Sequence, residues 1–261
     1  MQNMSNLKVT LVQTTLHWED KESNLKQFDN LISNQTASTD LIVLPEMFST
    51  GFSMQTKLAE TMDGDTIKWM KGKAKKLDVP FCGSLMMDVD GKFVNRFVWV
   101  NPNGTIQYYD KRHLFSIGNE HTHYSNGANH LVIDYKNWKL LIAICYDLRF
   151  PVWLRRTPTI EYDAMVIVAN WPERRSNHWR TLLQARAIEN QCYVIAVNRV
   201  GIDGNGVSHS GNSGLISPTG EWINEYENDI VLSTVQLFKN EVNNWRSVFQ
   251  VANDADLFNL A

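Results

Sequence analysis

Three side chains at the ends of strand-like runs could together perform acyl transfer. Cys145 interrupts the run LLIAICYDLRFP, Glu46 follows LIVLP, and Lys111 follows TIQYYD. A thiol can attack a carbonyl carbon, and a carboxylate at the edge of an apolar environment is a usable proton acceptor near neutral pH. A fixed ammonium stabilises an oxyanion and lowers the pKa of a neighbouring thiol. Taken singly, each has an ordinary alternative, as a buried cysteine, a loop acid or a solvated lysine.

The elements that must position these residues alternate in a βα rhythm. The patterns predict strands over residues 8–14, 40–45, 164–169 and 192–197, and helices that begin near 23 and 65 or span about 177–190. Residues 80–109 predict antiparallel strands, because Asp90-Gly91 and Asn103-Gly104 are hairpin-turn signals. Residues 201–214 predict a loop, followed by a hairpin over 215–237 that turns at 218–220. In open α/β sheets, chemistry gathers at the carboxyl ends of strands.

Length and composition indicate one globular α/β domain over residues 1–261, with 43% hydrophobic and 20% charged residues. A net charge of -3 gives no electrostatic reason to expect nucleic acid or a membrane as partner, so a small-molecule substrate is favoured. The segment MQNMSNLKVTLVQ lacks the features of a signal peptide, and the 3 cysteines form no C-x-x-C pair. We therefore expect a cytoplasmic protein with free thiols. The apolar segment at about 239–261 suggests packing on a partner subunit.

Three motifs in the expected order resemble the Glu-Lys-Cys triad of the nitrilase superfamily of carbon-nitrogen hydrolases. They are LPEMFSTGF, YDKRHLF and CYDLRFP, and the resemblance covers nearly the whole chain. Within the superfamily, NWPERRSNHW and NRVGIDGNG are most similar to bacterial omega-amidases. The resemblance implies an α/β fold, a four-layer αββα sandwich with mixed sheets, which commonly dimerises or forms a larger homo-oligomer. It also implies hydrolysis of the terminal amide of 2-oxoglutaramate or 2-oxosuccinamate, with no metal or organic cofactor.

The resemblance also implies a role for each catalytic residue. Glu46 would take the proton of Cys145, whose thiolate attacks the amide carbonyl. Lys111 and the backbone N–H of Tyr146 would hold the oxyanion. A second family glutamate maps onto Glu120, which would orient these groups or assist proton traffic.

Substrate recognition is expected from residues near the same strand ends. The far carboxylate of the substrate needs a cation, and Arg174 or Arg175 could bind it with a bidentate fork, although either could instead lie at the surface or an interface. Arg149 could form a structural ion pair. Three aromatic side chains could wall a small pocket or pack in the core, namely Phe48, Tyr124 and Trp171.

Other functions remain open at this level. His113, His121 and His123 lie near Glu120 and suggest a metal-dependent hydrolase, although no H-E-x-x-H pattern is present. His113 or His178 could serve as the base of a Cys-His enzyme. A non-enzymatic interaction protein is a further possibility, and a nitrilase or an amidase of carbamoylated amines would use the same triad.

Overall fold

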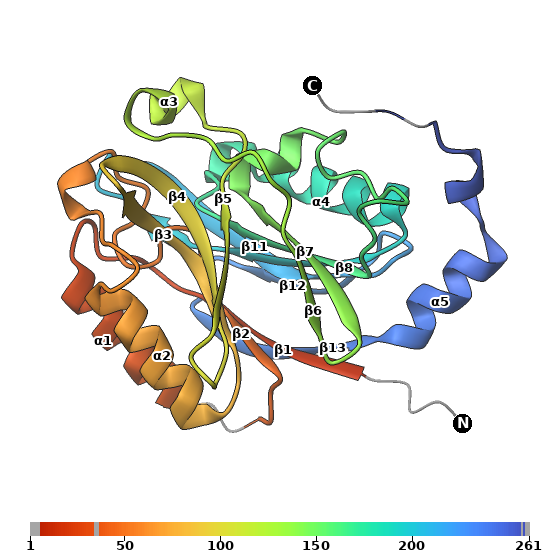
Figure 1. The fold of residues 1–261 in the computed structure, drawn as a ribbon, viewed down its shortest axis with the longest axis horizontal. Helices are drawn as coiled ribbons and strands as arrows, with labels where there is room; N and C mark the ends of the chain where they lie inside the picture. The colour runs from red at the N-terminus through yellow and green to blue at the C-terminus, as the bar shows by residue number, and fades with distance from the viewer. Residues whose placement is uncertain (1–5, 34–36, 257, 259–261) are drawn as a thin grey trace.

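Two mixed β-sheets lie face to face at the centre of the molecule, seen in a computed structural model that describes residues 6–33, 37–256 and 258 (Figure 1). The first sheet has the order β13 (Val231–Phe238), β1 (Asn6–Gln13), β2 (Leu41–Val43), β3 (Phe81–Val89), β4 (Lys92–Val100) and β5 (Ile106–Asp110). The second has the order β10 (Val200–Ile202), β11 (Ser208–Ile216), β9 (Tyr193–Asn198), β8 (Ala164–Ala169), β7 (Trp138–Ile144) and β6 (Val132–Tyr135), with β12 (Trp222–Glu227) paired to β11.

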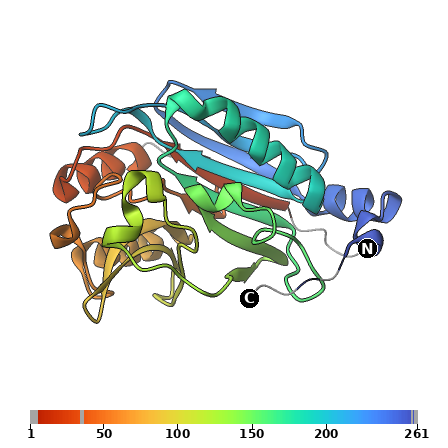
Figure 2. The same cartoon turned by 90° about the horizontal axis from the view of Figure 1, so that it is seen from above.

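Helices cover the outer faces of both sheets. The helices α1 (Lys21–Ser33) and α2 (Asp65–Leu77) lie on the first sheet, and α4 (Ser176–Asn190) lies on the second (Figures 1 and 2). The short α3 (Glu120–His123) stands above the edge of the sheets, and α5 (Lys239–Val248) extends beyond them (Figure 1). This arrangement confirms the predicted four-layer αββα sandwich.

The alternation of side chains along each strand explains why the sheets are covered on both faces. In and just after β2, Leu41 and Val43 enter the hydrophobic cluster between the sheets, whereas Ile42 and Leu44 enter the cluster under α1 and α2. Successive side chains of a strand point to opposite faces, so a continuous apolar run is the pattern that two buried faces require.

Strand direction brings the three predicted residues to one edge. Strand β2 is parallel to β3, and β4 is antiparallel to both β3 and β5, so β5 runs in the direction of β2. Glu46 and Lys111 therefore leave the first sheet at the same edge. Cys145 leaves the second sheet after β7, whose parallel neighbour β8 ends just before Asn170.

The prediction of a loop over residues 201–214 is wrong, because most of this segment forms β10 and β11. Its small residues permit close approach of neighbouring groups. A Cβ on Gly211 would lie 2.3 Å from the Gln13 side chain, and one on Gly214 would lie 2.0 Å from the Asn224 carbonyl. The predicted hairpin over 215–237 is also only partly correct. Strand β12 pairs with β11, but β13 crosses to the first sheet and pairs with β1.

The described part of the carboxyl-terminal segment contacts its own chain. Val242 of α5 is buried, and Arg246 donates to the backbone carbonyls of Gln191 and Tyr162 at 3.0 and 2.7 Å. Beyond these contacts Val248 and Phe249 stay exposed, at 81% and 52%. Residues 257 and 259–261 of the predicted partner-binding segment lie outside the described residues. None of the helices described here has the length and apolar character needed to cross a membrane.

Candidate active site

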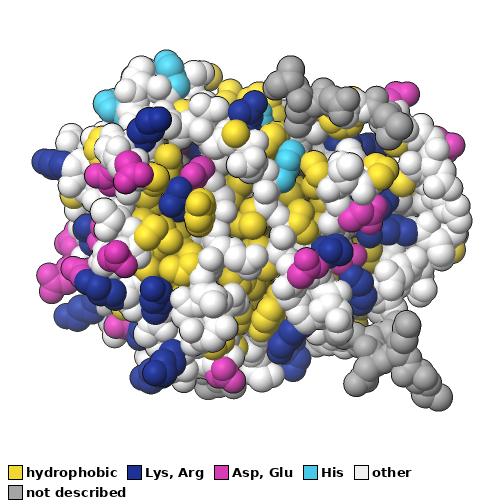
Figure 3. Space-filling model, viewed as in Figure 1, with side chains coloured by type: hydrophobic (Ala, Val, Ile, Leu, Met, Phe, Trp, Pro, Cys, Tyr) yellow, Lys and Arg dark blue, Asp and Glu magenta, His cyan; other side chains and the backbone are white. Residues whose placement is uncertain are grey.

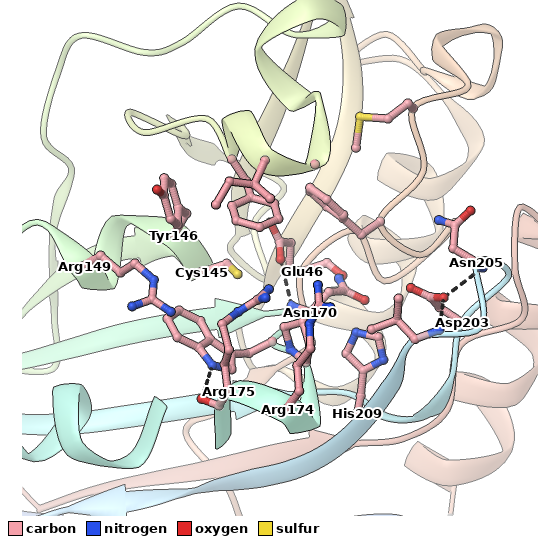
Figure 4. A pocket seen from close by; sticks show the side chains of 18 of the residues that line it. Glu46, Cys145, Tyr146, Arg149, Asn170, Arg174, Arg175, Asp203, Asn205 and His209 are labelled. Atoms are coloured by element: carbon pink, nitrogen blue, oxygen red, sulfur yellow. Dashed lines mark hydrogen bonds between the residues drawn. The ribbon is translucent and has the colours of Figure 1, made fainter. Parts of the chain in front are cut away.

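A cavity of about 210 Å³ opens at the edge where the strands of both sheets end (Figure 4). Glu46, Lys111 and Cys145 all line it, so residues from three separate strand ends share one enclosed space. Aromatic and basic side chains form much of the remaining wall, among them Phe115, Tyr146, Trp171, Arg149, Arg174 and Arg175.

The backbone turns sharply at Cys145 and presents its thiol to the cavity. The residue opens the 3₁₀ helix η3 (Cys145–Arg149) directly after β7, with φ at +42°, a left-handed conformation that is costly for a residue with a Cβ. The buried Asp147 supports this turn, because one of its carboxylate oxygens accepts from Ile144 N at 3.0 Å and from the Tyr109 hydroxyl at 2.8 Å. Since Tyr109 belongs to β5, the turn is tied to the strand that directly precedes Lys111.

The surroundings of the Cys145 thiol favour its protonated form. Burial raises its pKa well above the ordinary value, and the Glu46 carboxylate raises it further, whereas Lys111 opposes the shift. Lys111 therefore lowers the thiol pKa as expected, but burial and Glu46 raise it by more. A thiol in this state needs a base at the moment of attack.

The carboxylate of Glu46 is fully buried and firmly oriented. Its Oε1 accepts from Asn95 Nδ2 at 2.8 Å and from Lys111 Nζ at 2.9 Å, while its Oε2 accepts the backbone N–H of Asn170 at 2.7 Å. Asn170 also donates through Nδ2 to the backbone carbonyl of Glu46 at 2.6 Å. The second sheet therefore holds both the side chain and the main chain of this residue.

Lys111 lies between two buried glutamates. Its Nζ is 2.9 Å from Glu46 Oε1 and 2.9 Å from Glu120 Oε2. Burial alone would lower the lysine pKa, but Glu120 and Glu46 outweigh it, so the pKa is raised and the ammonium stays charged. Burial raises the pKa of Glu120, against the opposing effect of Lys111. A buried cation and two buried acids are stable only together, because each alone would pay a large desolvation cost.

Comparison with known proteins agrees with this geometry. Residues 8–247 match the family described as Carbon-nitrogen hydrolase. The chain is 42% identical to omega-amidase YafV of Escherichia coli (strain K12), over 98% of this chain and 100% of that protein. The chain belongs to the carbon-nitrogen hydrolase family.

Two further relatives of this carbon-nitrogen hydrolase cover most of its length. It is 32% identical to 2-oxoglutaramate amidase of Bacillus subtilis (strain 168), over 88% of this chain and 90% of that protein. It is also similar to the crystal structure of XC1258 from Xanthomonas campestris, a CN-hydrolase superfamily protein with an arsenic adduct in its active site. The TM-score is 0.96 at 38% identity, covering 99% of this chain and 100% of that one.

Two aromatic residues predicted to wall the pocket of this carbon-nitrogen hydrolase lie elsewhere. Phe48 packs in the core, edge-on to Phe28 at 5.5 Å between ring centroids. Tyr124 is buried, its backbone N–H donates to the Glu120 carbonyl at 2.9 Å, and its hydroxyl donates to the Ser53 carbonyl at 2.7 Å. Neither lines the cavity, and both therefore fall under the core-packing alternative. Trp171, the third predicted residue, does line it.

Three arginines reach the cavity from two elements. Arg175 is half-buried with its guanidinium 5.4 Å from the Phe115 ring centroid, whereas Arg174 is exposed. Arg149 does not form the expected ion pair: it lies over Trp171 at 4.7 Å and contacts His178 Nδ1 at 3.2 Å. Within the described part of the chain, no carboxylate forms a salt bridge with any of the three. Burial lowers the Arg175 pKa, as do Arg174 and Arg149.

Sequence reasoning missed three polar residues that hold the site together, namely Asn95, Asp147 and Asn170. Two of them had a visible signal, since Asp147 lies in the same run as Cys145 and Asn170 directly follows a predicted strand. Asn95 had none, because it lies inside β4 between Val94 and Arg96 and not at a strand end. Its contact with the site depends on strand register: its carbonyl accepts the backbone N–H of Lys111 at 2.9 Å.

The histidines of the alternative mechanisms have other contacts. His113 Nδ1 lies 2.8 Å from Asp147 Oδ1, and its ring stacks on Phe150 at 3.7 Å. Among the residues placed by the structure, no group of three or more His, Cys, Asp or Glu could hold a metal ion. Neither His113 nor His178 lines the cavity beside Cys145.

Proposed function

We propose that this carbon-nitrogen hydrolase is an omega-amidase that converts short dicarboxylic monoamides, such as 2-oxoglutaramate and 2-oxosuccinamate, to acid and ammonia. The observation that carries the proposal is one cavity lined by a thiol, a buried Glu-Lys pair and three arginines. Among the described residues, no carboxylate forms a salt bridge with these arginines. The names of the Escherichia coli and Bacillus subtilis relatives support the same substrate class.

Acylation begins with transfer of the Cys145 proton to Glu46. The thiolate attacks the amide carbonyl carbon, and the carbonyl π electrons move to oxygen. Lys111 Nζ and the backbone N–H of Tyr146 stabilise this oxyanion; the latter N–H lies in the first turn of η3, where no intrahelical acceptor exists. Glu46 then returns the proton to nitrogen, the C–N bond breaks, and ammonia leaves a thioester on Cys145.

Deacylation uses the same groups in reverse order. Glu46 takes a proton from water as the water oxygen attacks the thioester carbonyl. The C–S bond breaks, the acid product leaves, and Glu46 returns the proton to the thiolate. Glu120 keeps Lys111 beside the reacting carbon through contacts of 2.9 and 3.0 Å from Lys111 Nζ to its two carboxylate oxygens.

The arginines supply the charge that a dicarboxylic monoamide needs at its far end. Arg175 is the best placed, because it is half-buried, lines the same cavity as Cys145 and Tyr146, and lies 5.4 Å from the Phe115 ring centroid. The Asp203 carboxylate also lines the cavity, and its Oδ1 accepts the backbone N–H groups of Asn205 at 2.8 Å and Val207 at 2.9 Å. A guanidinium can bind a carboxylate with two parallel hydrogen bonds.

Ammonia release from a substrate panel tests the proposed activity. The panel contains 2-oxoglutaramate, 2-oxosuccinamate, glutamine, an aliphatic nitrile and a carbamoylated amine. We expect release from the two oxo-amides to exceed release from the others. No release from either oxo-amide would reject the substrate class, while release from the nitrile or the carbamoylated amine would select one of the two related activities.

Substitution of Arg175 tests how the substrate carboxylate is bound. We expect Arg175→Gln to raise KM for 2-oxoglutaramate roughly 10- to 100-fold, because a charge-assisted hydrogen bond is lost, with a much smaller change in kcat. Butyramide, which has no carboxylate, should show no such change. Arg180→Gln is the matched control, since Arg180 lies on α4, pairs with Glu225 and does not line the cavity. Equal KM values for Arg175→Gln and the native chain would remove this residue from recognition.

We also propose that residues 1–261 form one cytoplasmic domain that assembles into a homodimer or larger homo-oligomer. One hydrophobic cluster shared by both sheets supports a single domain, and the free thiols of Cys82, Cys145 and Cys192 suit a reducing compartment. Apolar side chains gather near the centre of the face in Figure 3, and Val248 and Phe249 are exposed on and beside α5. Sedimentation velocity would measure the assembly, and a monomer at micromolar concentration would contradict it.

A further inference from the structure

The side chain of Asn95 contacts both glutamates of the site. It is fully buried on β4, and its Nδ2 donates to Glu46 Oε1 at 2.8 Å and to Glu120 Oε1 at 3.3 Å. Both partners are carboxylate oxygens, so the amide must turn its NH₂ group toward them. One neutral side chain therefore supplies a donor to each of two buried acids.

The donors around these acids are unequally distributed. A carboxylate oxygen has two lone pairs, and three of the four oxygens receive two donors each. Glu46 Oε1 receives Asn95 and Lys111, Glu120 Oε1 receives the same two, and Glu120 Oε2 receives Lys111 at 2.9 Å and Phe115 N at 2.6 Å. Among the described residues, Glu46 Oε2 accepts one nitrogen donor, the backbone N–H of Asn170. One lone pair of Glu46 Oε2 is therefore free to accept a proton.

We propose that Asn95 is a positioning residue that keeps protons off the facing Oε1 atoms of Glu46 and Glu120, and so directs the thiol proton to Oε2 of Glu46. The inference rests on the proposed amidase function and extends it to a residue that does not line the cavity. The charged and titratable groups around the Asn95 amide come from four other segments: Glu46 after β2, Lys111 after β5, Glu120 and Tyr124 in and after α3, and Cys145 at the start of η3.

Loss of the Asn95 amide should move the acid limb of the pH profile in one direction, because of its contacts with the two carboxylates. A donor to a carboxylate favours its charged form, so removal of the Asn95 amide increases the proton affinity of the carboxylate pair. Hydrolysis requires Glu46 to be deprotonated before attack. The acid limb of the kcat/KM profile should therefore move to higher pH when the amide is removed.

The test compares pH profiles of kcat/KM for Asn95→Ala, Asn95→Ser and the native chain. We expect the acid limb to move up by about one pH unit in Asn95→Ala and by less in Asn95→Ser, whose hydroxyl can still donate to one carboxylate. Ser84→Ala is the control, because the buried Ser84 hydroxyl accepts Met47 N at 2.9 Å, next to Glu46, and forms no hydrogen bond with a charged side chain among the described residues. It should lower the rate without moving the limb. An unmoved limb in both Asn95 variants overturns the proposal.

A second measurement needs no amide turnover and keeps the two proposals separable. Alkylation of Cys145 by iodoacetamide, followed by mass spectrometry across pH, requires the same loss of the thiol proton. The Asn95 proposal predicts a matching upward movement of this profile in Asn95→Ala. If the native chain releases no ammonia from the substrate panel, the proposed function fails, and the alkylation profile still decides whether Asn95 controls the proton. If the alkylation profiles of Asn95→Ala and the native chain coincide, the Asn95 proposal is overturned.

Discussion

Replacement of the thiol in Cys145→Ala is expected to reduce amide hydrolysis by at least about 10⁴-fold while the fold is retained. The loss is large because no other nucleophile of comparable reactivity lines the cavity with Glu46 and Lys111 among the described residues. The backbone conformation at residue 145, with φ at +42°, is equally accessible to alanine and cysteine, since both have a Cβ. Turnover is measured as ammonia release, and folding by thermal unfolding.

Cys192→Ala is the matched control and should show the opposite pattern. Cys192 is fully buried ahead of β9, where burial raises its pKa to about 12, and it does not line the cavity. Its replacement leaves a small void that should cost about 1 kcal/mol, or roughly 2–4 °C in Tm, with turnover preserved. Residual turnover above about 1% in Cys145→Ala would mean that water attacks the substrate directly, and the thioester mechanism would then be wrong.

Local patterns were sufficient to predict the residues that follow strands. Glu46, Lys111 and Cys145 each come after a short strand-like run, and each of these runs contains a strand in the structure. Because β2 and β5 run in the same direction and the two sheets lie face to face, these three residues meet at one edge once the fold has formed. The family resemblance added Glu120, which the local pattern around GNEHTHY would not have distinguished from a surface acid.

Local sequence patterns could not predict contacts between residues that are distant in the chain. Phe48 lies two residues after Glu46, but the chain turns at Met47 with φ at +43°, and the Phe48 ring enters the cluster under α1 and α2. The small residues of β11 resemble a loop in sequence, although they are needed because Gln13 and Asn224 approach the strand closely. In sequence, Asn95 is only a polar residue within a predicted strand. The pairing of β4 with β5 is what brings it to the site.

The second large effect is expected for Glu46→Gln, which should lower kcat by about 10³-fold. The thiol of Cys145 would have lost its base, whereas burial, the largest cause of its raised pKa, would remain. The residual rate should rise with pH, because only direct ionisation of the thiol would then supply the thiolate. The measurement is kcat across pH for 2-oxoglutaramate.

Glu46→Gln should also fold, with a modest loss of stability. All three side-chain contacts of Glu46 are donors, so one of them must face the new NH₂ group of glutamine, at a cost of about 1–3 kcal/mol. His178→Gln is the control for a Cys-His mechanism: His178 contacts Arg149 at 3.2 Å, so its loss should change KM by only a few fold. A Glu46→Gln protein with near-native kcat, together with an inactive His178→Gln or His113→Gln protein, would transfer the role of base from the carboxylate to histidine.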